Sequence, residues 1–114
     1  PEMLAEAGRR IGQAKRDVHR HIGDFALFWA GLYPESLCGK ATDGKDVFHM
    51  YCHHGKRSYR IASTIDASDV NSPPADVLER LSDEFELCAY GLGEVRREFE
   101  RGDGDSTIRP VLFN

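Results

Sequence analysis

The first third of the chain carries its longest amphipathic pattern. Its members recur at alternating spacings of three and four, as the buried face of a heptad helix does. They are Leu4, Ala7, Ile11, Ala14, Val18, His21, Phe25, Phe28 and Leu32. We predict a helix over residues 2–33 with this stripe buried. Ile22, Ala26 and Trp29 widen the stripe toward the C-terminal half, where we expect the deepest burial. Pro34 ends the helix, because the residue before a proline avoids the helical conformation.

Four glycines interrupt this helix, and each one costs stability in a helix interior. They are Gly8, Gly12, Gly23 and Gly31. Two interpretations stay open. Either the small residues let a neighbouring helix come close, or the helix bends or breaks near Gly23.

A second helix is predicted over residues 46–64, after a loop (34–45) with room for one short helical turn. Asp46 is the expected cap. The apolar face, with His54 and Ser58 beside it, consists of Val47, Phe48, Met50, Tyr51, Ile61, Ala62 and Ile65. The β-branched residues at its end, 59–65, are also compatible with a strand.

The third helix is predicted over residues 73–101. Ser72 and Pro73 form a favourable start, with a capping side chain followed by proline at the first helical position. Its apolar stripe is Leu78, Leu81, Phe85, Cys88, Leu92, Val95 and Phe99. Gly102 and Gly104 stop the helix, and the apolar tail 107–114 is expected to fold back on the bundle.

These patterns predict an all-α fold, a bundle of three main helices in a single domain over residues 1–114. Helices of this length exceed what a chain of 114 residues needs for one core, and each carries a heptad stripe. We therefore expect self-association, that is, a homo-oligomer or a protein partner.

Composition narrows the functional classes. Hydrophobic residues make up 40% and charged residues 30%, as in globular proteins. The net charge of −4 disfavours a dedicated nucleic-acid or membrane-surface binder. Three cysteines without a CxxC pair suit a reducing cytoplasm, and no apolar run approaches the roughly 18 residues of a membrane span. We expect a cytoplasmic protein.

A metal site is the first chemical hypothesis. His49 and His53 are four residues apart, which allows two imidazoles to share a metal ion. Asp17, His21 and Asp24 have ligand-compatible spacing on the first helix. Both sets lie mainly on polar faces, so they are expected to meet only across a subunit interface, and solvated polar residues are the competing interpretation. Apart from such a metal ion, no cofactor is predicted.

Basic residues give a further hypothesis, a nucleic-acid-binding module. One cluster spans Arg9–Arg20, including Arg10 and Arg16, and the other is Lys56-Arg57. Neither forms a Gly-rich phosphate loop, so nucleic acid is a less favoured partner than protein. No catalytic motif such as GxSxG, HExxH or GxGxxG occurs, and we predict no catalytic residue.

Three stretches resemble segments of uncharacterised bacterial helical proteins of unknown function. They are Arg20–Trp29 (RHIGDFALFW) continuing through Leu32–Glu35 (LYPE), Gly55–Tyr59 (GKRSY) and Phe85–Cys88 (FELC). The resemblance spans residues 18–100 and implies no activity, cofactor or functional residue. Such proteins have more chain upstream, and this chain begins with Pro1 rather than Met, so a preceding segment is expected. The long amphipathic helices, and not this resemblance, give the leading functional hypothesis, which is a helical interaction or assembly module.

Overall fold

Residues 2–38 and 44–104 are described in the computed structural model, and all regular secondary structure among them is helical. The helices are α1 (Glu2–Leu32), α2 (Pro34–Cys38), α3 (Gly44–Ser63), α4 (Ala75–Asp83) and α5 (Phe85–Gly104). The predicted all-α, bundle-like fold is confirmed, as is the short helical turn after Pro34. The strand considered for residues 59–65 is absent, because α3 continues to Ser63.

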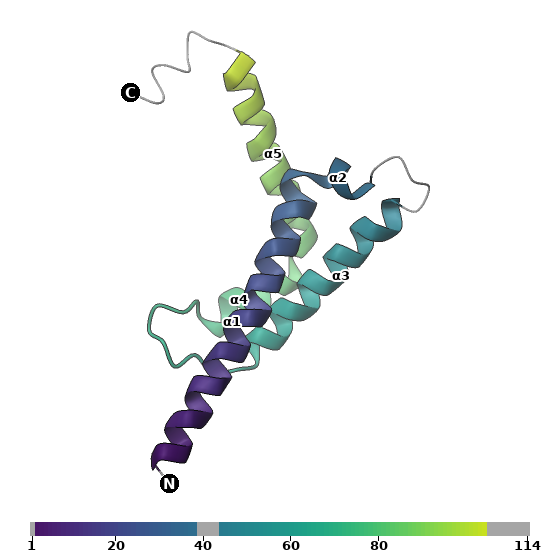
Figure 1. The fold of residues 1–114 in the computed structure, drawn as a ribbon. Helices are drawn as coiled ribbons and strands as arrows, with labels where there is room; N and C mark the ends of the chain where they lie inside the picture. Colours follow the sequence, from purple (N-terminus) through teal and green to yellow (C-terminus); the bar gives the residue numbers. More distant parts are fainter. Residues whose placement is uncertain (1, 39–43, 105–114) are drawn as a thin grey trace.

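Helices α1 and α3 pack side by side in opposite directions (Figure 1). Glycine makes the close approach possible at two places. A Cβ on Gly23 of α1 would lie 2.7 Å from Tyr59 Cε1 of α3, and a Cβ on Gly55 of α3 would lie 3.0 Å from Ala26 Cβ of α1. Helix α1 is continuous through Gly23, so Gly23 serves close packing and does not break the helix.

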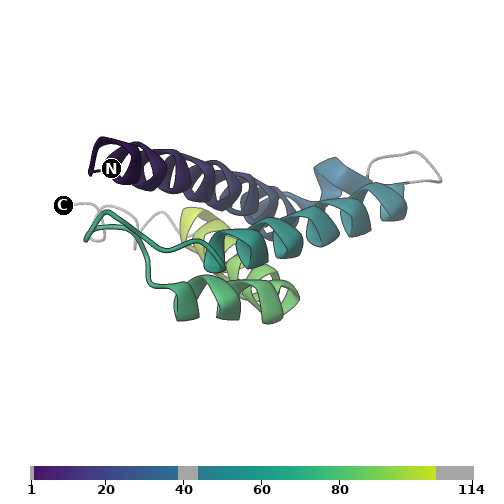
Figure 2. The ribbon, with the colours of Figure 1, turned by 90° about the horizontal axis from the view of Figure 1, so that it is seen from below.

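Helices α4 and α5 form a second layer against the first (Figure 2). Leu78 of α4 and Phe85 of α5 are fully buried, and the Phe85 ring lies 6.2 Å from the ring of Tyr59. Small residues of α1, α3 and α5 complete the core, namely Ala26, Ala30, Cys52, Ala62 and Ala89. The centre of the domain is thus two aromatic rings and a leucine set among small side chains.

The face of α1 that enters this core differs from the predicted one. The buried residues of α1 are Arg16, Gly23, Ala26, Ala30 and Gly31, whereas the predicted stripe is exposed, with Leu4 at 79%, Ile11 at 70% and Phe25 at 59%. The burial prediction is therefore wrong for this stripe, although Ala26 is buried as expected and burial is deepest in the C-terminal half. Its physical reason is that the small face lets α3 and α5 approach more closely than a face of large side chains would.

Other stripe positions also differ from expectation. On α3, His54 is exposed and Met50 is half-exposed, whereas Tyr59 is buried. On α5, Val95 and Phe99 are largely exposed, because this end of the helix extends beyond the bundle (Figure 1). Leu78 and Phe85 are buried as predicted.

The predicted third helix is two helices. Glu84 interrupts it with φ −111° and ψ 28°, and the bend lets α4 pack on α3 while α5 packs on α1. Ser72 does not cap α4, which begins after Pro74 without a side-chain cap. Helix α3 begins at Gly44, so Asp46 lies inside the first turn and the predicted cap at Asp46 is also wrong. The predicted tail 107–114 lies outside the described residues.

A buried arginine explains why Ser72 is not a cap. Arg16 is 1% exposed; its Nε donates a hydrogen bond to the Ile65 carbonyl oxygen at 2.8 Å, and its Nη1 donates one to Ser72 Oγ. Gln13, one turn earlier, accepts a hydrogen bond from the Ser68 amide at 2.7 Å. These bonds fasten the α3–α4 loop to α1.

The molecule is elongated for its size. Its radius of gyration is 18.1 Å, whereas a compact domain of this length has about 13 Å. The N-terminal turns of α1 and the C-terminal end of α5 both extend beyond the bundle (Figure 1). Among the described residues, no helix combines the length and the apolar character needed to cross a membrane.

Candidate functional site

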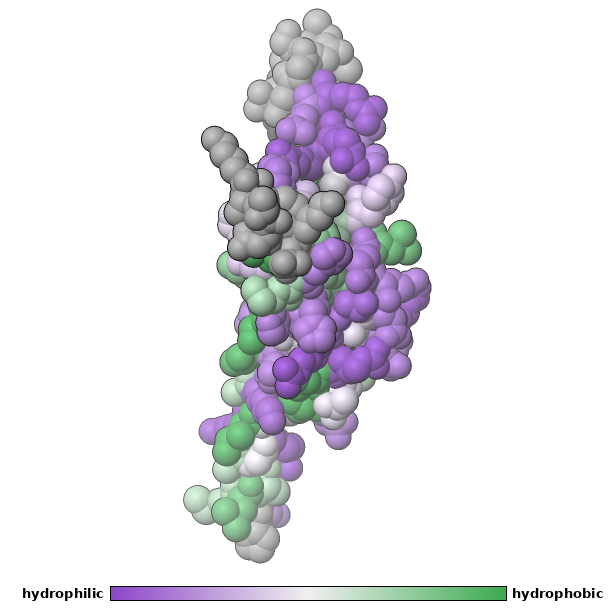
Figure 3. Space-filling model, turned by 90° about the vertical axis from the view of Figure 1, so that its right-hand side faces the viewer, coloured by the Kyte–Doolittle hydropathy of each residue, from purple (hydrophilic) through white to green (hydrophobic). Residues whose placement is uncertain are grey.

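The main candidate site is the outer face of α1, defined here as Leu4, Ala7, Ile11, Ala14, Val18, His21, Phe25 and Phe28. All of these residues are exposed. In Figure 3, hydrophobic side chains follow the N-terminal part of α1, while hydrophilic residues cover much of the neighbouring surface. A continuous apolar surface of this kind on a folded chain indicates an interaction site.

The outer face has a regular composition. Leu4, Ile11, Val18 and Phe25 are each seven residues apart, and the second row runs Ala7, Ala14, His21 and Phe28 at the same interval. These are the a and d positions of a heptad repeat. The buried face of α1 lies on roughly the opposite side of the helix. Helix α1 therefore has a small-residue face toward its own chain and a large-residue face toward the outside.

Aromatic rings enlarge the C-terminal half of the outer face. Phe25 stacks on Tyr51 of α3 with ring centroids 6.4 Å apart, and Phe28 meets Trp29 edge-on at 5.7 Å. Trp29 also lies 5.5 Å from Tyr33, whose ring is covered by the guanidinium of Arg96 at 5.0 Å. This half is therefore a broad, preformed aromatic surface, whereas the N-terminal half is a narrow ridge of aliphatic side chains.

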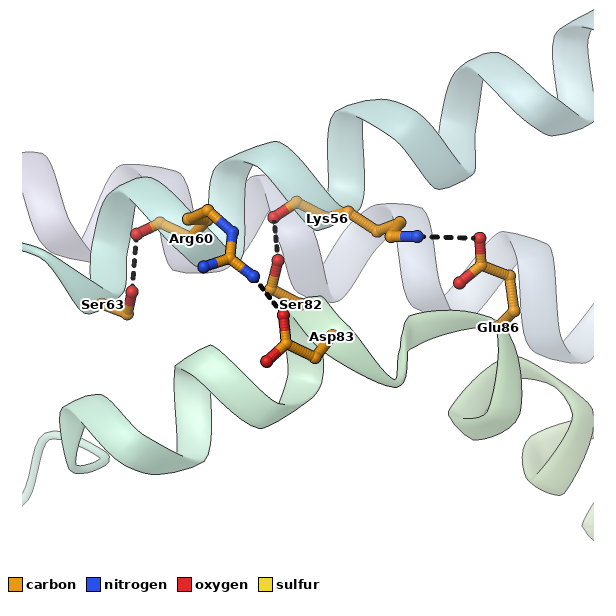
Figure 4. Close-up of polar contacts among 6 residues, drawn as sticks. All are labelled: Lys56, Arg60, Ser63, Ser82, Asp83 and Glu86. Atoms are coloured by element: carbon orange, nitrogen blue, oxygen red, sulfur yellow. Dashed lines mark hydrogen bonds and ion pairs between the residues drawn. The ribbon is translucent and has the colours of Figure 1, made fainter.

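A second, polar site lies between α3 and the α4–α5 junction. It is a cavity of about 550 Å³ whose lining includes His49, Cys52 and His53. Figure 4 shows how this junction is held: Lys56 Nζ pairs with Glu86 Oε2 at 3.1 Å, Arg60 pairs with Asp83, and Ser82 donates a hydrogen bond to the Lys56 carbonyl oxygen at 2.7 Å. The charged groups of Lys56, Arg60, Asp83 and Glu86 are thus paired within the chain.

The cavity contains no activated nucleophile among its described residues. Burial raises the pKa of the Cys52 thiol, and the nearby Glu86 carboxylate adds to the effect, so the thiol stays protonated and unreactive at neutral pH. For Glu86, burial opposes ionisation, but a backbone hydrogen bond and Lys56 outweigh it and lower its pKa. The carboxylate therefore stays charged and paired.

The residues predicted for a metal site are not gathered in one copy of the chain. His49 and His53 border the polar cavity, whereas Asp17 accepts a hydrogen bond from Gln13 Nε2 and Asp24 accepts one from the Tyr59 hydroxyl. Among the side chains that the structure describes, no group of three or more His, Cys, Asp or Glu residues is placed to hold an ion. His21 lies on the outer face of α1, separate from His49 and His53 of α3.

The basic residues predicted for nucleic acid do not form a common patch. Arg16 is buried, which corrects its place in that cluster, because its guanidinium is used inside the fold. Arg9 and Arg10 both pair with Glu6, and the two arginines lower the pKa of that carboxyl group. Lys56 pairs with Glu86. Among the described residues, most of these cations thus already have a carboxylate partner.

Sequence reasoning identified the members of the outer face but assigned them to the wrong side of α1. The signal that distinguishes the two faces is side-chain size. Gly12, Gly23, Ala26 and Ala30 also follow helical spacing, and they mark where a helix can come closest. The buried role of Arg16 has no such signal, because its partners, Ile65 and Ser72, are remote in sequence.

No family model, curated protein or solved structure matches the chain. The resemblance seen in residues 18–100 therefore stays a prediction.

Proposed function

We propose that the protein is a helical assembly module that binds a second copy of itself through the outer face of α1. The observation that supports this most directly is the exposure of the large apolar residues of the heptad stripe, from Leu4 to Phe28. A stripe with this spacing is the surface by which helices pair. Nothing within the described chain covers it.

The large apolar side chains of the outer face gain free energy when they are removed from water. A leucine, isoleucine, valine or phenylalanine gains about 1.5–3 kcal/mol when it is fully buried, and on this helix much of that gain is unrealised, since Leu4 is 79% and Ile11 70% exposed. A symmetric dimer buries the same set of side chains on both copies. Self-association through this face is thus both the predicted oligomeric state and the proposed function.

A cytoplasmic location belongs to the same proposal. Cys52 and Cys88 are free thiols, and free thiols suit a reducing compartment. Within the described residues, neither the polar cavity nor the basic residues supply an observation that favours a metal-binding or nucleic-acid-binding role over assembly.

Sedimentation velocity tests the proposal with two matched substitutions. Val18→Lys places a charge in the middle of the outer face, whereas Val70→Lys makes the same change at a residue of the α3–α4 loop that is 97% exposed. We expect the unmodified protein to dimerise, Val18→Lys to weaken dimerisation about tenfold or more, and Val70→Lys to leave it unchanged. Circular dichroism checks that both variants keep their helices.

A strictly monomeric protein at high concentration would contradict the proposal. Equal dimerisation of the unmodified protein and Val18→Lys would move the interface away from α1.

A further inference from the structure

We infer that the two α1 helices pair antiparallel, so that the N-terminal arm of each copy covers the aromatic half of the other. The arm is defined as residues 2–11. This inference rests on the proposed self-association and adds its geometry. It commits to a second copy of the chain as the occupant of the outer face.

The described residues of the same chain give the arm no tertiary support. Every residue from Glu2 to Ile11 is exposed, and a Cβ on Gly8 would meet nothing within 4 Å. The first close neighbour appears at Gly12, where Ile65 lies 3.7 Å from the position of an added Cβ. The aromatic half, in contrast, is firmly anchored by Gly23 and Ala26 in the core. An antiparallel pair places each unsupported arm on an anchored half.

Side-chain sizes match in this arrangement. With the twofold axis between Ala14 and Val18, the facing pairs are Leu4 with Phe28, Ala7 with Phe25, Ile11 with His21, and Ala14 with Val18. The small alanines thus lie opposite larger side chains, which is how facing layers interdigitate at interior density. A parallel pair would instead place Ala7 on Ala7 and Phe25 on Phe25, leaving gaps at one end and crowding at the other.

Charges beside the stripe favour the same direction. In the antiparallel pair Arg10 of each copy faces Asp24 of the other, and this pair forms on both sides of the twofold axis. Asp24 accepts a hydrogen bond from Tyr59 and lies 3.5 Å from Arg20 of its own helix. Its side chain is still 48% exposed, so the carboxylate remains accessible to the second copy. In a parallel pair Arg10 would instead face Lys15 of the other copy, and like charges repel there.

Two charged residues, Asp17 and Lys15, lie beside the twofold axis, where each faces the same residue of the second copy. Asp17 is drawn away from the seam by Gln13, whose Nε2 donates to Asp17 Oδ1 at 2.9 Å. Lys15 is exposed and carries a long side chain that reaches solvent. Both like-charged pairs at the axis can therefore direct their charges away from the seam.

Photochemical cross-linking tests the geometry. Phe25 is replaced by the photoreactive aromatic benzoylphenylalanine, which keeps a large apolar ring at an exposed position. After irradiation, covalent dimers are isolated and the joined peptides are mapped by mass spectrometry. We expect the link to fall within residues 4–11 of the second copy. The same replacement at Val70 is the control and should give no covalent dimer.

Reversing the charge of Arg10 gives an independent test, because it weakens dimerisation in an antiparallel pair and strengthens it in a parallel pair. In the antiparallel pair Arg10→Glu places two carboxylates opposite each other and should weaken dimerisation about tenfold. In a parallel pair the same change would face Lys15 and strengthen it. Arg9→Glu is the matched control, because Arg9 also pairs with Glu6 but lies away from the seam, and it should change dimerisation less than twofold.

The outcomes separate this inference from the proposed function. Links within residues 21–28, or stronger dimerisation of Arg10→Glu, would overturn the antiparallel direction while leaving self-association intact. A dimer by sedimentation that links at other segments, or not at all, would overturn pairing through α1. A monomer by sedimentation would overturn the proposed function itself.

Discussion

Arg16 shows how a single charged residue can serve the interior of this fold. Its guanidinium lies where α1 meets the α3–α4 loop and donates to the Ile65 carbonyl and the Ser72 hydroxyl. A buried cation is costly unless its donors are satisfied, and these two acceptors supply partners across a large sequence separation. Because the loop supplies both acceptors, Arg16 fixes where the chain turns before α4.

Tyr59 is the second buried polar contact of α1. Its ring fills the space over Gly23, and its hydroxyl donates a hydrogen bond of 2.5 Å to Asp24 Oδ1. Burial raises the pKa of Tyr59 far above its usual value near 10, and the bond to Asp24 raises it further. The folded state therefore holds the neutral phenol.

This pKa shift predicts a loss of stability in alkali. A raised pKa in the folded state gives stability that is complete below the unfolded pKa, about 10, and declines as the pH rises above it. We expect the free energy of unfolding to fall between pH 9 and pH 11, and to fall less in Tyr59→Phe. Urea denaturation at both pH values measures the difference. An identical decline in both proteins would show that Tyr59 does not ionise on unfolding.

At the scale of single elements, α1 combines two faces of different size. The buried face, with Gly23, Ala26 and Ala30, lets the ring of Tyr59 lie directly on the helix backbone. The opposite face carries the large apolar residues. The small residues thus serve the fold, and in the proposed dimer the large ones serve assembly.

A pair of glycine substitutions tests this division. Gly23→Ala inserts a methyl group against the Tyr59 ring, so we expect the free energy of unfolding to fall by about 1–3 kcal/mol. Gly8→Ala meets open space and should raise helix stability by up to about 1 kcal/mol. Both are measured by urea denaturation at one protein concentration, because the stability of a dimer depends on it. Equal effects of the two changes would refute close packing at Gly23.

The elements also show what the sequence could predict. The period of apolar residues predicted α1 and α3 to within two residues at their ends, because helical spacing depends on local pattern alone. The pattern could not decide which face of α1 turns inward, since both faces repeat at helical spacing. Nor could it predict the bend at Glu84, which depends on α4 and α5 packing against different helices.

At the scale of the whole molecule, the shape is elongated because two helices extend beyond the packed core. The arm of α1 and the end of α5 extend beyond the layers (Figure 1), and Val95 and Phe99 add exposed apolar surface on α5. A short helical extension without tertiary contacts is marginally stable in water. In the proposed dimer, the second copy supplies the contacts that the arm lacks.

Hydrogen–deuterium exchange of residues 2–11 across a range of protein concentrations tests the central claim most directly. If a second copy covers the arm, its amides exchange mainly from the monomer. Once the dimer dominates, their exchange should then slow about threefold for each tenfold rise in concentration. Exchange that is rapid and independent of concentration, while the amides around Tyr59 stay protected, would contradict the account.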